Sequence, residues 1–257
     1  MEKKAYNTNN SNSEYQDFME CDFRKHWSFS NFNRHLITAS AINDFYEENK
    51  LPLNIVELGA GDSNLSSMLY YNFNKIAAVS VYYKFDVDEK YSSHCEIRDI
   101  TTREFEKELK KIKPNVIILE EVIEHISKTD GKELIRTCYE SMKNNGLLIV
   151  STPTPPYTGI FENLVWPDDH EEEYKEYEIY QLLNKYFKIE KRIGWSMEKR
   201  DFNEILEFDD FARRVYCKLR GAFPESYIRA LLPSLLEEKH SRQMLYICRK
   251  RRGIVNA

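Results

Sequence analysis

No run of about 18 consecutive apolar residues occurs in the 257-residue sequence, so a membrane-spanning helix is not expected. The N-terminal segment lacks the apolar stretch of a secretory signal, and residues 1–13 are rich in Asn and Ser, which predicts a disordered lead-in. The cysteines are odd in number and never have CxxC spacing. This argues against a disulfide framework or a cysteine-rich zinc site and favours a cytoplasmic location. The five are Cys21, Cys95, Cys138, Cys217 and Cys248.

The sequence also has no excess of basic residues, because 37 Lys and Arg stand against 42 Asp and Glu, a formal net charge of −5. A long nucleic-acid footprint normally needs a net basic face, so the charge argues against one, although contact with a single nucleic-acid end needs fewer cations. A P-loop, zinc-finger spacing and a Ser/His/Asp arrangement are likewise missing from the sequence.

Short apolar runs alternate with longer amphipathic stretches from Ile55 onward, a rhythm typical of βαβ units. Two of the runs are almost wholly apolar, as expected for central parallel strands covered on both faces. The expected strands are Asn54–Leu58, Ile76–Val81, Cys95–Ile97, Val116–Leu119, Leu147–Ser151, Phe187–Gly194 and Met244–Cys248. The expected helices are His35–Glu48, Asn64–Asn72, Thr102–Lys111, Lys132–Lys143 and Lys175–Tyr186. We therefore expect one α/β domain over residues 14–257, with seven strands and helices on both faces.

Two regions depart from this rhythm. Residues 14–33 are rich in aromatic side chains, and we expect them either to form a lid over a ligand or to cover exposed core. Residues 198–240 interrupt the expected final hairpin with two helices, at about 208–219 and 225–238. We interpret this second region as a late helical insertion.

The strongest short motif, Glu57-Leu58-Gly59-Ala60-Gly61-Asp62-Ser63-Asn64, joins the first strand to a helix. Glycine permits a tight turn and lets a ligand lie close to the backbone, and the amides at the start of a helix favour an anionic group. ELGAGDSN strongly resembles motif I of class I S-adenosylmethionine-dependent methyltransferases, and the resemblance extends over roughly residues 53–195. It implies a Rossmann-like fold and S-adenosylmethionine as cofactor, with Gly59, Ala60 and Gly61 along the methionine part and Glu57 below it.

Other cofactor contacts follow from the same resemblance. In the family the second strand usually ends in an acidic residue that binds the ribose hydroxyls, but here that strand reads IAAVSVYY, and Asp86 and Asp88 come several residues later. The third strand ends CEIRDI, which makes Asp99 the candidate for adenine binding, with Ile100 beside the ring; Asp99 also stands where it would cap a helix. Glu120, at the end of the fourth strand, completes the expected cofactor set.

The fourth strand runs into Glu120-Glu121-Val122-Ile123-Glu124-His125. If the chain is helical here, Glu121, Glu124 and His125 share one face, and His170 follows in WPDDH. This ExxEH…H pattern resembles the metal site of small-RNA 3′-terminal 2′-O-methyltransferases, which implies Glu121, Glu124, His125 and His170 as ligands of Mg²⁺, Mn²⁺ or Fe²⁺. EVIEH also resembles a sequence found in many methyltransferases that act on quinones, sugars and other small molecules, some of which have no metal. There Glu124 and His125 cap a helix or line the cofactor cleft, and His125 or His170 is a candidate general base.

Three functions remain open from the sequence. The first is O-methylation of a hydroxylated polar small molecule, such as a sugar or nucleotide derivative. The second is 2′-O-methylation of RNA 3′ ends, and the third is a non-catalytic methyltransferase-like binding subunit, which the missing acid after the second strand favours. The sequence does not indicate an oligomeric state.

Overall fold

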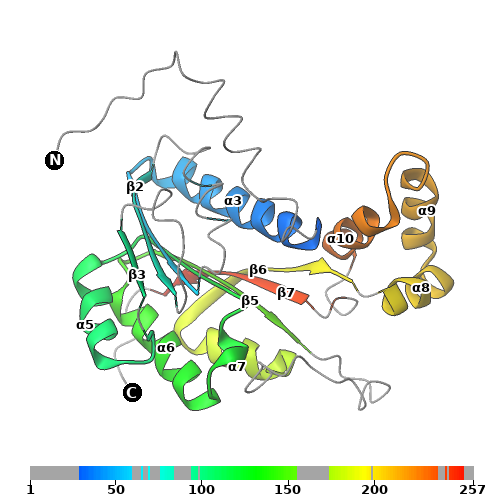
Figure 1. Cartoon of the computed structure of the whole chain (residues 1–257). Coiled ribbons are helices and arrows are strands. Elements are labelled where there is room, and N and C mark those ends of the chain that lie inside the picture. The colour runs from blue at the N-terminus through cyan, green and yellow to red at the C-terminus, as the bar shows by residue number, and fades with distance from the viewer. Residues whose placement is uncertain are drawn as a thin grey trace.

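A computed structural model describes residues 29–59, 65, 69, 76–83, 94–97, 99–154, 174–197, 199–236, 241 and 243–251. Within these ranges a single mixed sheet forms the centre of the molecule (Figure 1). Its strand order is β3-β2-β1-β4-β5-β7-β6. The strands are β1 Leu53–Leu58, β2 Ile76–Tyr83, β3 His94–Ile97, β4 Val116–Glu120, β5 Leu147–Pro153, β6 Phe187–Ser196 and β7 Gln243–Lys250.

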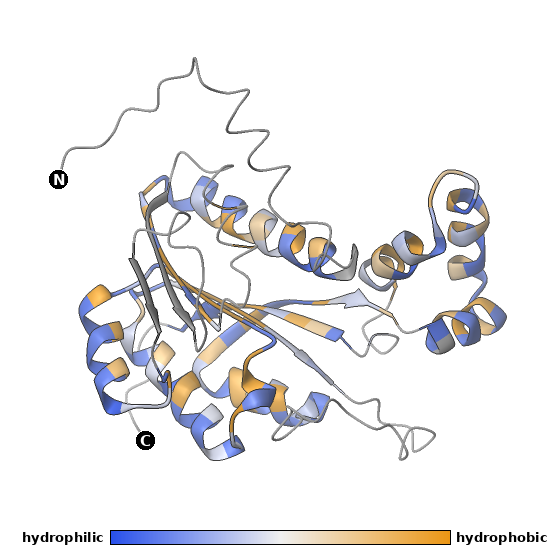
Figure 2. Ribbon diagram, viewed as in Figure 1, coloured by the Kyte–Doolittle hydropathy of each residue, from blue (hydrophilic) through white to orange (hydrophobic). Residues whose placement is uncertain are grey.

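The pairings between β3 and β5 are all parallel, whereas β7 is antiparallel to both β5 and β6. Every side chain of β4 and β5 is buried, including those of the apolar runs Val116–Leu119 and Leu147–Val150, which the sequence predicts to be covered on both faces. Figure 2 shows hydrophobic residues along the central strands. Because β1, β4 and β5 are parallel neighbours, their carboxyl ends meet at one edge of the sheet, where ligands bind in open α/β folds.

Helices cover both faces of the sheet, so the expected Rossmann-like α/β class is confirmed. One face packs on α3 (Phe29–Asn49), through Ile42 and Phe45. The other packs on α5 (Arg103–Ile112), α6 (Lys128–Ser141) and α7 (Glu176–Tyr186). The helix expected at Asn64–Asn72 lies mostly outside the described residues; Leu65 and Leu69 are helical and buried against the α3 side.

Local capping fixes where the helices begin. The Thr102 hydroxyl accepts a hydrogen bond from the Phe105 amide and starts α5 where the sequence predicts. Ser127 caps α6 in the same way through Asp130, so this helix begins at Lys128, four residues before the expected Lys132. Gly131 lies inside this helix, where a Cβ would stand 2.2 Å from the Tyr174 hydroxyl oxygen, so the packing of Tyr174 favours glycine at this position.

The region after β6 contains three helices rather than the two expected. They are α8 (Lys199–Phe208), α9 (Asp210–Leu219) and α10 (Glu225–Leu235), and they share a small core of their own. Asp209 ends α8 and caps α9 by accepting from the Ala212 amide, which divides one continuous amphipathic stretch into two helices. None of the described helices is long and apolar enough to cross a membrane.

Helix α3 begins six residues before the expected His35, so residues 29–33 of the proposed lid belong to a helix. The rest of the lid, residues 14–28, and the lead-in 1–13 lie outside the described residues. The Asn33 amide nitrogen donates to the Trp195 carbonyl oxygen at 3.1 Å and to the Ala230 carbonyl oxygen at 2.8 Å. These two bonds attach the beginning of α3 to β6 and α10.

Candidate functional site

The turn after β1 requires glycine at its first position. Gly59 has φ +70°, a conformation that side chains disfavour, and a Cβ at this position would lie 2.4 Å from Cγ2 of Val122. Glu57 precedes the turn and is buried within β1. Because Val122 follows β4, the connections after two neighbouring strands touch at this point. Ala60 and Gly61 lie outside the described residues, so the cofactor contacts expected here remain predictions.

A Gly59→Ala substitution is expected to disrupt this turn and to weaken binding of S-adenosylhomocysteine at least about tenfold, because both the positive φ and the Val122 side chain oppose a methyl group. Isothermal titration measures the affinity. In the double variant Gly59→Ala/Val122→Ala the clash is relieved but the positive φ is not, so we expect partial recovery. Wild-type affinity in the single variant would show that the turn does not hold the cofactor.

Asp99 and Ile100 lie at the turn between β3 and α5. The Asp99 Oδ1 atom accepts hydrogen bonds from the backbone amide of Thr101 at 2.9 Å and from its hydroxyl at 2.6 Å. Helix α5 is capped by Thr102, so Asp99 shapes the turn before the cap and is not the cap itself. Ile100 is half-buried against the core. The adenine contact expected for this pair remains a prediction.

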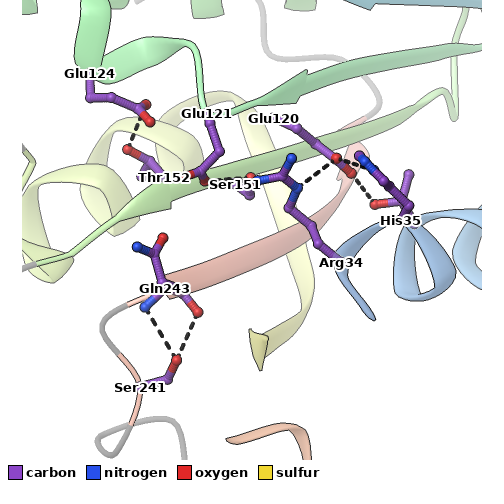
Figure 3. A network of polar contacts seen from close by, with 10 residues as sticks. Arg34, His35, Glu120, Glu121, Glu124, Ser151, Thr152, Ser241 and Gln243 are labelled. Carbon is purple, nitrogen blue, oxygen red and sulfur yellow. Dashed lines mark hydrogen bonds and ion pairs between the residues drawn. The ribbon is translucent and has the colours of Figure 1, made fainter. Parts of the chain in front are cut away.

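Glu120, the last residue of β4, is held by three side chains of α3 (Figure 3). Arg34 Nε and His35 Nδ1 each lie 2.9 Å from Glu120 Oε2, and the Thr38 hydroxyl donates to Oε1. Burial alone would raise the pKa of Glu120, but the charges of Arg34 and His35 and the hydrogen bonds of His35 and Thr38 outweigh it, so its pKa is about 2. Both carboxylate oxygens are thus engaged within the chain, and the cofactor contact expected for Glu120 would have to share them.

Arg34, His35 and Thr38 were not among the site residues predicted from the sequence. Arg34 and Thr38 are four residues apart and His35 and Thr38 three apart, so they share one face of α3. The sequence spacing alone could have placed these residues on one helical face, but the expected helix began at His35 and so excluded Arg34. The contact with Glu120 joins residues 86 positions apart, which local patterns do not reveal.

The chain does not enter an α-helix after β4, so the condition under which Glu121, Glu124 and His125 would share one helical face is not met. Glu121 has φ +54°, and residues Ile123–His125 form a short 3₁₀ helix, η3. Within this turn, Glu121 Oε1 accepts from the Ser151 hydroxyl at 2.8 Å, and Glu124 Oε2 accepts from the Thr152 hydroxyl at 3.0 Å (Figure 3). Both carboxylates thus face consecutive residues of β5, whereas the His125 side chain is exposed.

Glu124 is fully buried, and its Oε1 atom has no hydrogen-bond partner among the described residues. Burial, and after it the neighbouring charge of Glu121, raise the pKa of this carboxyl to about 8, against the lowering effects of a backbone hydrogen bond, the Thr152 hydroxyl and the charge of Arg34. Glu120 and Glu124, four residues apart, therefore have pKa values shifted in opposite directions. Such a pair is typical of functional sites.

A buried carboxylate oxygen without a partner, beside a second carboxylate, suits a cation in its chemistry. Within the described part of the chain, however, no three His, Cys, Asp or Glu side chains gather into a set that could hold a metal ion. His170, the fourth predicted ligand, lies outside the described residues. The structure thus brings Glu121 and Glu124 together but does not add His125 to them.

Comparison with known proteins identifies related folds. A family model described as a methyltransferase domain matches residues 30–212. A structure of an S-adenosylmethionine-dependent methyltransferase from Archaeoglobus fulgidus is 14% identical, with a TM-score of 0.57 over 92% of this chain and 100% of that one. The N-methyltransferase NodS from Bradyrhizobium japonicum, solved with S-adenosylhomocysteine, is 10% identical, with a TM-score of 0.51 over 95% of this chain and 100% of that one.

The methyltransferase domain of bacterial CtHen1 has a similar fold, with 14% identity and a TM-score of 0.52 over 86% of this chain and 99% of that one. A search of curated protein sequences gave no match. At these identities the solved structures support the fold and not a shared substrate.

Proposed function

The chain belongs to the methyltransferase-domain family, with S-adenosylmethionine as its expected methyl donor, and from this premise we propose that it O-methylates a hydroxylated polar small molecule, such as a sugar or nucleotide derivative. The observation that carries the proposal is the pair Glu121 and Glu124 at the carboxyl end of β4. In this proposal the donor lies against the Gly59 turn, and the acceptor hydroxyl lies beside the carboxylate pair.

The sulfonium methyl group is already activated, so the protein must align the acceptor oxygen behind it and take up the hydroxyl proton. Glu124 supports the second task, since its Oε1 has no hydrogen-bond partner among the described residues and its ionised form, which predominates above its pKa of about 8, can accept the hydroxyl proton. We therefore assign the general base to Glu124 Oε1 in preference to the exposed His125. His170, the other base candidate, stays a prediction.

A metal-assisted form of the same reaction uses the carboxylates differently. Glu121, Glu124, His125 and His170 would hold a Mg²⁺ or Mn²⁺ ion, which would polarise the acceptor hydroxyl. Glu124 cannot be both a ligand and the free base, so the two forms are separable. If Glu124 is the base, EDTA treatment leaves the rate within about twofold of the untreated enzyme. A rate lost on chelation and restored by Mn²⁺ would establish the metal-assisted form instead.

Methylation of RNA 3′ ends is the second candidate. The EVIEH sequence, His170 and the fold similarity to the CtHen1 domain support it. Transfer of a radiolabelled methyl group to a single-stranded oligoribonucleotide, followed by periodate oxidation, separates the candidates. We expect the terminal diols to stay fully oxidisable while hydroxylated metabolites accept label, whereas periodate-resistant ends would establish the RNA reaction. Because the chain belongs to an enzyme family, a non-catalytic binding subunit is not retained.

A further inference from the structure

The guanidinium of Arg34 contacts two consecutive carboxylates at the end of β4. Its Nε atom lies 2.9 Å from Glu120 Oε2, and its Nη1 atom lies 3.8 Å from Glu121 Oε1 (Figure 3). The side chain is only 10% exposed, so water screens these contacts weakly. Guanidinium is planar and carries several N–H groups in a fixed fork, which allows one side chain to bind two acceptors in different directions.

The position of Arg34 is fixed independently of these ion pairs. The neighbouring Asn33 side chain binds the carbonyl oxygens of Trp195 and Ala230, which holds the beginning of α3 on β6 and α10. The Arg34 guanidinium also lies over the Trp195 ring, 4.8 Å from its centroid. This cation–π contact is a further interaction that holds the guanidinium near the end of β4.

Glu121 needs such support because its backbone is strained. With φ +54°, a non-glycine residue is in the left-handed region, which costs about 1–2 kcal/mol and persists only where surrounding contacts enforce it. The described contacts of Glu121 include its amide to the Ser151 carbonyl oxygen at 3.0 Å, its carboxylate to the Ser151 hydroxyl, and Arg34. This turn brings Glu121 close enough for its charge to act on Glu124.

We propose that Arg34 is a positioning residue for methyl transfer: with one guanidinium it binds Glu120 as an anchor and fixes the Glu121 carboxylate beside Glu124 at the acceptor end of the sheet. The proposal rests on the acceptor site assigned above and adds a residue from α3, before the glycine turn, to that site. Arg34 does not touch the reacting atoms. It acts through the orientation of Glu121.

The substitution Arg34→Lys tests the proposal, since an ammonium can still pair with Glu120 but cannot reach Glu121 at the same time. Thr38→Val is the matched control, because it removes another hydrogen bond to Glu120 and leaves Glu121 untouched. We expect both variants to bind S-adenosylhomocysteine with an affinity within about threefold of wild type and to lose similar, modest stability.

In crystals of the Arg34→Lys variant with S-adenosylhomocysteine, we expect the Glu121 carboxylate to leave the Ser151 hydroxyl, whereas in the Thr38→Val variant it stays. An unchanged Glu121 in the Arg34→Lys structure would overturn the proposal, and this result does not depend on knowing the acceptor.

On an acceptor that the wild type methylates, kcat should fall about 10–100-fold for Arg34→Lys with KM little changed, and remain near wild type for Thr38→Val. If kcat fell equally in both variants, Arg34 would have only a structural role. A wild type that binds cofactor but methylates nothing would count against the proposed function, while the crystal structures would still decide the role of Arg34.

Discussion

Replacing Glu120 by glutamine is expected to lower the free energy of unfolding at pH 7 by about 3–5 kcal/mol, because the buried Arg34 guanidinium would lose its closest carboxylate, 2.9 Å from its Nε atom. The pKa of Glu120 leads to a similar figure. Its value of about 2, against an ordinary 4.5, corresponds to about 3 kcal/mol of stabilisation from the charged form. Chemical denaturation at pH 7 measures the difference.

The pH dependence follows from the direction of this shift. A carboxyl whose pKa is lowered on folding stabilises the protein above pH 4.5, and this stabilisation is lost as the pH falls toward 2. The Glu120→Gln variant should lack that part of the acid dependence. Glu133→Gln is the matched control, because Glu133 forms an ion pair with Arg136 while 61% exposed, and it should cost less than about 1 kcal/mol. Equal losses in the two variants would show that the buried cluster does not stabilise the fold.

Replacing Glu124 by glutamine is expected to have the opposite effect on stability and a severe effect on activity. The folded protein holds a proton on Glu124 up to pH about 8, whereas the unfolded chain loses it near the ordinary pKa of 4.5. The stability contributed by this residue is therefore complete below pH 4.5 and is lost as the pH rises to about 8. A glutamine stays neutral, so above pH 8 the variant should exceed wild-type stability by an amount on the order of 3–5 kcal/mol.

The same variant lacks the proposed base, so kcat should fall at least about 100-fold although the protein is more stable. A wild-type kcat that rises with pH toward a plateau above about 8 is expected as well. Thr152→Val is the control for Glu124, because it removes the hydrogen bond to Oε2 and keeps the carboxyl. If Glu124→Gln destabilised the protein at pH 9, the ionised Glu124 carboxylate would have hydrogen-bond or charge partners that stabilise it in the fold. If the variant kept full activity, another group would be the base.

Much of the fold could be predicted from the sequence because the strands are short apolar runs. Val116–Leu119 and Leu147–Val150 stand out in the sequence as buried strands, and each expected strand range overlaps one in the structure. The errors occur where local pattern and tertiary contact disagree. Helix α3 begins at Phe29 although its first residues, Phe-Ser-Asn-Phe-Asn, carry no clear helical pattern; Asn33 there is held by distant carbonyl groups of β6 and α10.

The candidate site was predictable in composition but not in geometry. The residues of Glu120–His125 were identified from the sequence, yet a helical turn was assumed because no glycine indicates a left-handed residue at Glu121. The opposite pKa shifts of Glu120 and Glu124 could not be predicted from the sequence either, since the partners of these carboxylates lie on α3 and β5. Adjacent carboxylates in a sequence give no sign of which one is paired and which one is buried without a partner.

Titration of the purified protein with S-adenosylmethionine and S-adenosylhomocysteine tests the central claim most directly. We predict saturable binding of both compounds at one site per chain, and binding at least about tenfold weaker in the Gly59→Ala variant. The absence of measurable binding of either compound by a folded wild-type protein would contradict it.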